Sequence, residues 1–168
     1  MNTANIQLDV RRQAVLAALV LCDTAPRVGD AAGWNARIDT VRKDGLGAIA
    51  DMVMDRWFSP GFQQQRTDEL ALWRNLFLRS DPKGYAATCA TLRDTDLTTD
   101  ISRIVTPTLV VAGEADRSTP PDLVRACATA IAGARFQAMP DVGHIPSIEQ
   151  PAELAALIEN FLKENGHG

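Results

Sequence analysis

The fold of this chain is restricted most by two continuous apolar runs, at residues 16–21 (LAALVL) and 108–112 (TLVVA). Runs of this kind, bounded by polar and turn-forming residues, are typical of strands that are buried on both faces, as in a parallel sheet. A third, shorter strand is predicted at 135–139 (RFQAM). The sequence therefore predicts three mostly parallel strands.

A helical segment is predicted between the first two strands. Apolar residues recur at helical spacing in four stretches, at 34–41, 49–57, 70–77 and 85–92. Glycine, serine and proline residues separate these stretches. Because no strand interrupts them, we expect four helices that form an insertion sitting on the sheet.

Two further helices are predicted after the second and third strands, at 121–132 and 151–163. Strands that alternate with helices in this way are typical of the α/β class with a parallel sheet. We divide the chain into a lead-in with the first strand (1–30), a helical segment (31–99) and a second α/β segment (100–168).

Composition excludes several classes of partner. The 17 Lys and Arg residues are scattered and the net charge is −4, so we expect neither nucleic acid nor an anionic membrane surface as a partner. No apolar stretch is long enough to cross a membrane. The three cysteines and two histidines lack metal-binding spacing, so we expect no metal site. An odd number of cysteines without a motif indicates free thiols in a reducing compartment, which predicts the cytoplasm.

An acidic residue and a histidine follow the second and third strands. Asp116 lies in the loop of TLVVAGEADRSTPP, and His144 lies in PDVGHIPSIEQP. Parallel sheets place their sites at the carboxyl ends of the strands. An imidazole can take the proton of a serine, while a carboxylate fixes its tautomer and stabilises the imidazolium. We therefore interpret Asp116 and His144 as the acid and base of a catalytic triad.

Each of these residues also has a structural interpretation. Asp116 is placed where an aspartate often shapes a turn, and His144 beside a glycine is by itself uninformative. Their order, and their equal placement on two successive strand-and-helix units, favour the catalytic interpretation of the pair.

Three segments resemble a known family. The segments PTLVVAGEAD (107–116) and DVGHIPSIEQP (141–151) are similar to the last third of α/β-hydrolases. The block at 18–60, from ALVLCD to RWFSP, resembles the 3-oxoadipate enol-lactonase branch, which acts in the β-ketoadipate pathway of aromatic catabolism. The resemblance implies the C-terminal part of the hydrolase fold, with residues 31–99 as a cap. It also implies a lactone or ester substrate, a serine nucleophile, an acyl-enzyme and no cofactor. Residues 1–13 show no such resemblance.

The resemblance makes Trp34 and Arg37 candidate substrate-binding residues. They lie one helical turn apart on the predicted cap, so they can face one pocket. Arg37 would then bind a substrate carboxylate, with Trp34 as a wall of the pocket. The alternative is that Trp34 packs inside the cap and Arg37 is an exposed surface charge. Trp57 is predicted to be a core residue.

The Gly-x-Ser-x-Gly turn that carries the nucleophile of such hydrolases is not in this sequence. No serine has glycine at both elbow positions; the serines are Ser59, Ser80, Ser102, Ser118 and Ser147. We therefore expect a truncated, split or rearranged hydrolase that is inactive alone. The first strand would have an unpaired apolar edge, which predicts self-association or pairing with a complementary N-terminal chain.

Two alternatives remain open at this stage. The chain could be a non-catalytic oligomeric or ligand-binding module that retains the aspartate and histidine, in which case it would bind a dicarboxylate without turnover. It could also belong to a different α/β-hydrolase, such as a general esterase or a haloperoxidase-like enzyme, that a second chain completes.

Overall fold

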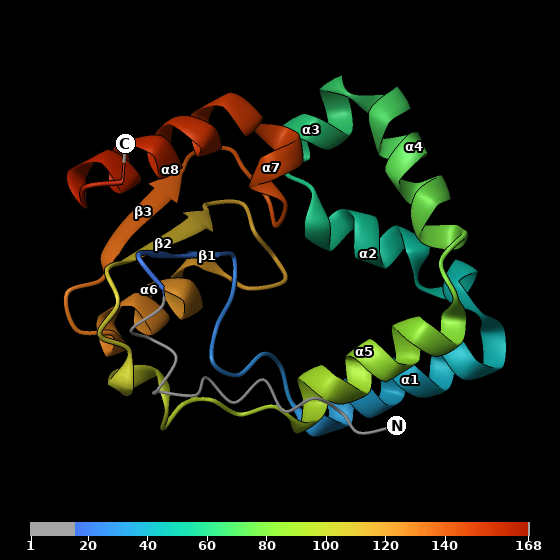
Figure 1. The fold of residues 1–168 in the computed structure, drawn as a ribbon. Helices are drawn as coiled ribbons and strands as arrows, with labels where there is room; N and C mark the ends of the chain where they lie inside the picture. Colours follow the sequence, from blue (N-terminus) through green and yellow to red (C-terminus); the bar gives the residue numbers. More distant parts are fainter. Residues whose placement is uncertain (1–15, 168) are drawn as a thin grey trace.

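The computed structural model describes residues 16–167, and its centre is a three-stranded parallel sheet (Figure 1). The strands are β1 (Leu19–Cys22), β2 (Thr108–Gly113) and β3 (Arg135–Met139), in the order β1-β2-β3. Both pairings are parallel, with Val20 opposite Leu109 and Val110 opposite Phe136. This confirms the predicted α/β class. The first strand lies further along the chain than its predicted range, because Leu16 stands outside the sheet and is exposed.

The central strand β2 has two apolar faces, each covered by one helix. Leu109 and Val111 pack against α8 (Pro151–Glu164), in a cluster that includes Phe161. Val110 and Ala112 face the other way and pack against α6 (Pro121–Ala130). Figure 1 shows α8 and α6 on opposite sides of the sheet. Successive side chains of a strand point to opposite faces, which explains why the run has no polar alternation.

Five α-helices lie between β1 and β2 and form a group beside the sheet (Figure 1). Helices α1 and α5 pack side by side, and α2, α3 and α4 form the opposite part of the group. Their bounds are α1 Ala31–Asp44, α2 Ala50–Trp57, α3 Pro60–Gln65, α4 Thr67–Leu78 and α5 Pro82–Asp94, with a short 3-10 turn at Leu46–Ala48.

Within the helical group, α3 is the α-helix that the periodicity does not predict. Ser59 and Pro60 end the second predicted stretch, but they also begin a new helix. Ser59 Oγ accepts a hydrogen bond from the N–H of Phe62 at 3.2 Å, and Pro60 occupies the first helical position. The remaining short helices are the 3-10 turn Ile101–Arg103 and α7 (Pro146–Glu149).

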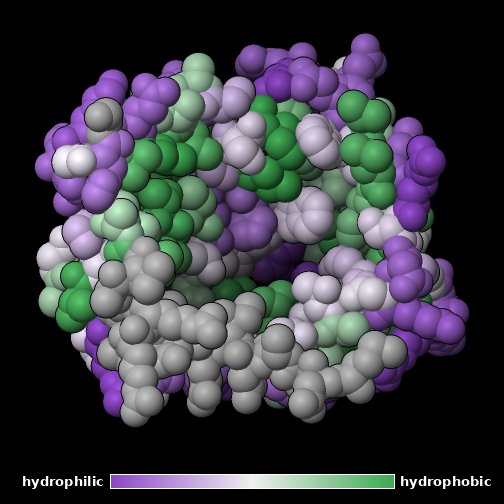
Figure 2. Space-filling model, viewed as in Figure 1, coloured by the Kyte–Doolittle hydropathy of each residue, from purple (hydrophilic) through white to green (hydrophobic). Residues whose placement is uncertain are grey.

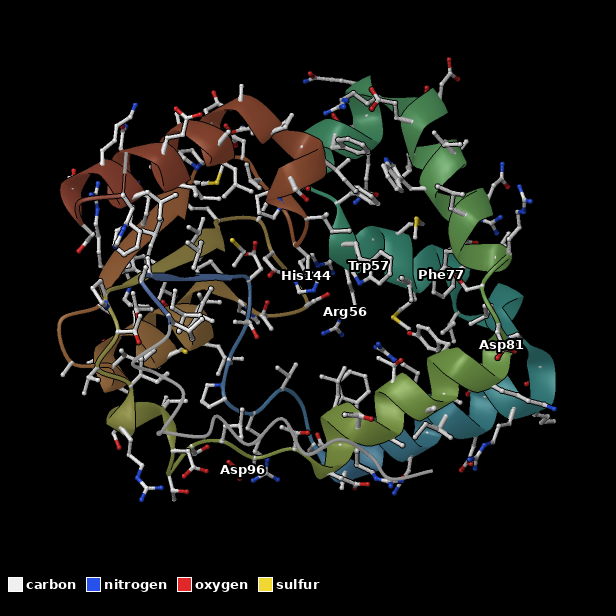
Figure 3. The ribbon with its side chains drawn as sticks, viewed as in Figure 1. Arg56, Trp57, Phe77, Asp81, Asp96 and His144 are labelled. Atoms are coloured by element: carbon white, nitrogen blue, oxygen red, sulfur yellow. The ribbon has the colours of Figure 1, made fainter. Side chains whose placement is uncertain are left out.

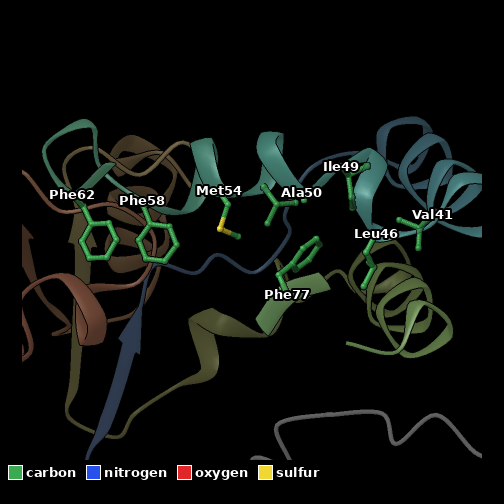
Figure 4. Packing of buried hydrophobic residues seen from close by; sticks show 9 residues of the cluster. Val41, Leu46, Ile49, Ala50, Met54, Phe58, Phe62 and Phe77 are labelled. Carbon is green, nitrogen blue, oxygen red and sulfur yellow. The ribbon is translucent and has the colours of Figure 1, made fainter. Parts of the chain in front are cut away.

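The helical group has its own apolar core, shown in Figure 4. The Phe58 ring stacks on that of Phe62 with centroids 4.5 Å apart, and Phe77 meets the edge of Trp57 at 5.8 Å. Ile145 and Ile148, from the segment after β3, pack against this core. The helical group is therefore joined to the histidine loop by apolar contact.

In the part of the chain that the structure describes, no helix is long and apolar enough to cross a membrane.

Phe58→Ala should lower the free energy of unfolding by about 3–5 kcal/mol, because Phe58 is only 1% exposed and its removal leaves a cavity. Urea denaturation followed by circular dichroism measures this change. The control is Leu72→Ala on α4, where the leucine is 54% exposed and the expected loss is below about 1 kcal/mol. Equal losses in both variants would show that Phe58 does not anchor this core.

Candidate active site

The loop after β2 holds the carboxylate of Asp116, which is 3% exposed. Its Oδ1 accepts hydrogen bonds from the backbone N–H groups of Ser118 at 2.7 Å and Thr119 at 3.1 Å. Its Oδ2 accepts one from Thr119 Oγ1 at 2.6 Å. Burial raises the pKa of Asp116, but hydrogen bonds from His144, Thr119 and Ser118 outweigh burial and bring this pKa below its usual value. The group is therefore held as a carboxylate.

The loop after β3 presents the imidazole of His144 to that carboxylate. His144 Nδ1 lies 2.9 Å from Asp116 Oδ2, and the backbone N–H of His144 donates to the carbonyl of Trp57 at 2.8 Å. Within residues 16–167, no group hydrogen-bonds to Nε2. A carboxylate on Nδ1 favours the tautomer that carries its proton there, which leaves Nε2 free to accept a proton. The structure thus brings the two predicted residues together.

Two glycines allow the two loops to touch through their backbones. A Cβ on Gly113 would lie 2.1 Å from the carbonyl oxygen of Gly143. A Cβ on Gly143 would lie 2.6 Å from Glu149 Oε1 and 2.7 Å from the Trp57 carbonyl oxygen. Neither position accepts a larger residue without movement of the backbone, so the His144 loop is fixed against the end of β2.

Glu149 is a residue of this site that sequence reasoning missed. Its carboxylate accepts hydrogen bonds from Ser59 Oγ at 2.5 Å, from the Ser59 N–H at 3.2 Å and from the Gly143 N–H at 2.9 Å. It therefore joins the junction of α2 and α3 to the residue before His144. The sequence carries no local signal for this role, because Ser59 and Glu149 are 90 residues apart.

Asp23, at the end of β1, is a second missed residue. It is 4% exposed, its Oδ1 accepts a hydrogen bond from the Gly113 N–H at 2.7 Å, and its Oδ2 has no hydrogen-bond partner among the described residues. Burial raises the pKa of Asp23 to about 7; the charge of Asp116 adds to this, while the Gly113 N–H and the charge of His144 oppose it. In the sequence, the feature that could have identified Asp23 as a site residue is its position directly after a predicted strand.

Thr119 connects these groups. Its Oγ1 lies 2.6 Å from Asp116 Oδ2, 2.8 Å from the Asp23 carbonyl oxygen and 3.2 Å from His144 Nδ1. A hydroxyl has one proton to donate, so Asp116 Oδ2 and the Asp23 carbonyl oxygen compete for it. Thr119 thereby links the ends of β1 and β2 to the histidine.

A cavity of about 470 Å³ opens between the strand ends and the helical group. Figure 2 shows it as a hollow whose depth is strongly hydrophilic, with apolar surface on its walls. His144, Trp34 and Arg37 all line it, whereas Asp116 lies behind the histidine. Trp57 also lines it, in addition to packing on the core as predicted. The candidate base His144 and the candidate binding residues Trp34 and Arg37 therefore line the same cavity.

The structure gives Trp34 and Arg37 both packing contacts and access to the cavity. Trp34 Nε1 donates to the carbonyl of Val28 at 2.7 Å, which fixes the indole. The Arg37 guanidinium lies over the Trp34 ring, 5.1 Å from its centroid, and its Nη2 lies 3.7 Å from the sulfur of Met52. Arg37 is partly buried and is not a freely solvated surface charge. Across residues 16–167, no group of three or more His, Cys, Asp and Glu side chains is placed to hold a metal ion.

Comparison with known proteins gives one family. The model of the alpha/beta hydrolase family matches residues 4–157, so the similarity extends into residues 1–13, where the sequence by itself showed none. Two curated relatives, 3-oxoadipate enol-lactonases 2 and 1 of Acinetobacter baylyi, are each 29% identical over 86% and 93% of this chain. The chain spans only 54% and 58% of their lengths, which is little more than half.

Solved structures agree with this result. The enol-lactonase from Burkholderia xenovorans LB400 matches with a TM-score of 0.84 and 34% identity, over 92% of this chain and 60% of that one. A malate-bound esterase from Thermogutta terrifontis matches with a TM-score of 0.83 and 28% identity, over 92% of this chain and 58% of that one.

Asp23→Asn should remove part of the pH dependence of stability. The pKa of Asp23 is raised from 3.8 to about 7 in the folded chain, so the folded state binds more protons than the unfolded state between these values. The contribution of Asp23 to stability therefore falls as the pH rises from about 4 to about 7 and is constant above. Relative to wild type, the Asn variant should gain stability over this window, by roughly a few kcal/mol in total.

Urea denaturation at pH 4.5, 6 and 8 measures this change. Asp96→Asn is the control, since Asp96 is exposed and its hydrogen bonds with Thr98 lower its pKa. A constant difference between Asp23→Asn and wild type across the three pH values would contradict the raised pKa of Asp23.

Proposed function

The chain belongs to the alpha/beta hydrolase family, and we propose that Asp116 and His144 are the acid and the general base of a serine-type ester hydrolase. The observation that supports this most directly is the 2.9 Å contact between His144 Nδ1 and Asp116 Oδ2, with Nε2 left free at the wall of the cavity. Both residues stand on loops that follow parallel strands. The order of acid and histidine along the chain is the one that this family uses.

The proposed reaction is the hydrolysis of a lactone of the 3-oxoadipate enol-lactone type, within the β-ketoadipate pathway of aromatic catabolism. Identities of 29% to two enol-lactonases and 34% to a third support this choice. Arg37 would bind the free carboxylate of the substrate, and Trp34 would form an apolar wall beside it. A guanidinium stacked on an indole is well suited to hold a carboxylate in a fixed direction.

In the proposed mechanism, His144 Nε2 takes the proton of a serine that attacks the lactone carbonyl. The ring oxygen leaves and receives that proton from His144, so an acyl-enzyme forms. A water molecule then gives its proton to Nε2 and attacks the acyl carbon, and the serine leaves as the proton returns to it. Asp116 stabilises the imidazolium in both halves of the cycle.

We propose that the serine and the oxyanion donors come from residues outside these 168. No Gly-x-Ser-x-Gly sequence is present. Among the described residues, β1 pairs only with β2, and its other edge carries apolar residues. We propose that the nucleophile-bearing structure, or a second copy of this chain, pairs with that edge of β1. The three free cysteines are consistent with a reducing compartment, and we propose the cytoplasm.

A carboxylesterase is the second candidate function. The esterase from Thermogutta terrifontis is 28% identical with a TM-score of 0.83, nearly the same as the enol-lactonase structure. The same Asp116 and His144 would serve it, but the substrate would be an acyclic ester. Comparison of lactone and ester rates in the completed enzyme decides between the two.

Intact mass spectrometry after treatment with a fluorophosphonate should show no added mass on the 168-residue chain. The probe reacts with an activated serine, and none of the five serines stands at a nucleophile turn. An active lactonase treated in parallel is the positive control. Labelling of any serine in this chain would contradict the proposal that the nucleophile comes from elsewhere.

Fusion to the nucleophile-bearing part of the Burkholderia xenovorans enol-lactonase should give an enzyme that opens enol-lactones. In that fusion, Asp116→Asn and His144→Gln should each lower kcat by about three to four orders of magnitude, because the base is lost or held in the wrong tautomer. The matched control is Asp122→Asn, on the exposed side of α6. A fusion that folds and is equally active with His144→Gln would contradict the proposal that His144 is the general base.

A further inference from the structure

Arg56, which sequence reasoning did not select, has a guanidinium without a partner in the cavity. It lies in α2 and lines the cavity, and Figure 3 shows its side chain reaching from α2 into the central opening beside His144 and Trp57. No hydrogen bond or ion pair joins its guanidinium to another residue of the described chain. An arginine of intermediate burial at a cavity wall, with its donors unused by the described residues, is available to bind an anion.

The acidic residues of α2 do not neutralise Arg56. Asp51 pairs with Arg74 at 2.7 Å, and Asp55 pairs with Arg117 at 2.6 Å. None of the four residues of these two ion pairs lines the cavity. The charge of Arg56 is therefore directed into the cavity with no acidic residue of its own helix bound to it.

The backbone around Arg56 is fixed against both catalytic loops. The carbonyl of Arg56 accepts a hydrogen bond from Ser118 Oγ at 3.5 Å, and the carbonyl of Trp57 accepts one from the His144 N–H at 2.8 Å. These bonds place the backbone of Arg56 and Trp57 beside the loops of Asp116 and His144. Arg37 stands on another helix, α1, where it stacks on Trp34.

We propose that Arg56 is a second carboxylate-binding residue of the cavity, which acts together with Arg37 so that the cavity prefers dicarboxylates to monocarboxylates. This rests on the proposed function, because opening a lactone that already carries one carboxylate produces a second one beside His144. Arg37 holds the carboxylate that the substrate brings, and Arg56 holds the carboxylate that hydrolysis creates. Charge-assisted hydrogen bonds from two guanidinium groups fix both ends of the product.

The test measures ligand binding and needs no catalysis. Adipate is titrated into the 168-residue chain and compared with its monoamide, in which a neutral amide of the same shape replaces one carboxylate. Isothermal titration gives both Kd values. Intrinsic fluorescence is a second readout, since Trp34 and Trp57 line the cavity. Wild type should bind adipate about tenfold more tightly than the monoamide, as expected for one added charge-assisted contact.

Arg56→Gln should abolish this preference, and Arg56→Lys should restore part of it. The matched control is Arg42→Gln, which removes the same charge from an exposed position of α1 outside the cavity and should keep the wild-type preference. Circular dichroism of each variant establishes that it is folded. Wild type that binds both ligands equally, or Arg56→Gln with an unchanged preference, would overturn the inference.

The inference and the proposed function can fail separately. A fused enzyme that opens lactones while Arg56→Gln keeps the dicarboxylate preference would overturn the role of Arg56 alone. Dicarboxylate binding that depends on Arg56, in a chain whose fused form hydrolyses nothing, would support the role of Arg56 and count against the hydrolase function.

Discussion

The backbone of Gly113 lies directly against the carbonyl groups of Val142 and Gly143, and the geometry of the whole site depends on this contact. It places the histidine loop at the carboxyl end of β2, where the Ala115 N–H donates to the Val142 carbonyl at 2.8 Å. From there His144 Nδ1 reaches Asp116 Oδ2 of the neighbouring loop at 2.9 Å. Because the contact is between backbones, it depends on the absence of a side chain at Gly113 and Gly143.

The helical group contributes to the same geometry from the opposite side. The Trp57 carbonyl accepts a hydrogen bond from the His144 N–H, and the Glu149 carboxylate accepts hydrogen bonds from Ser59 and Gly143. These bonds join α2 and α3 to the histidine loop, and Ile145 packs on the core of the helical group. A movement of α2 would therefore displace His144 as well as the cavity wall. The helical group and the loop of His144 are mechanically connected for this reason.

Sequence patterns predicted those parts of the molecule that depend on local or periodic order. The strands were found because β2 is buried on both faces, and Asp116 and His144 were found because they follow strands. Asp23 and Glu149 were missed because their bonds, to Gly113 and Ser59, each join positions 90 residues apart. Helix α3 was missed because Ser-Pro-Gly both ends one helix and caps the next. Arg56 was missed because an arginine between an aspartate and a tryptophan is unremarkable until its neighbours are seen to be paired.

The charges around the cavity bear on the acidic product that we propose for this site in a protein of net charge −4. Its walls carry Arg37, Arg56 and Asp30, while Asp116 is enclosed behind His144 and burial raises the pKa of Asp23 to about 7. A protonated Asp23 adds no negative charge, so the cavity carries less negative charge below about pH 7 than above it. As Asp23 ionises, negative charge is added to the wall that faces the two arginines. The buried aspartate at the end of β1 and the arginine of α2 therefore act in opposite directions on the affinity for carboxylates that we propose for this cavity.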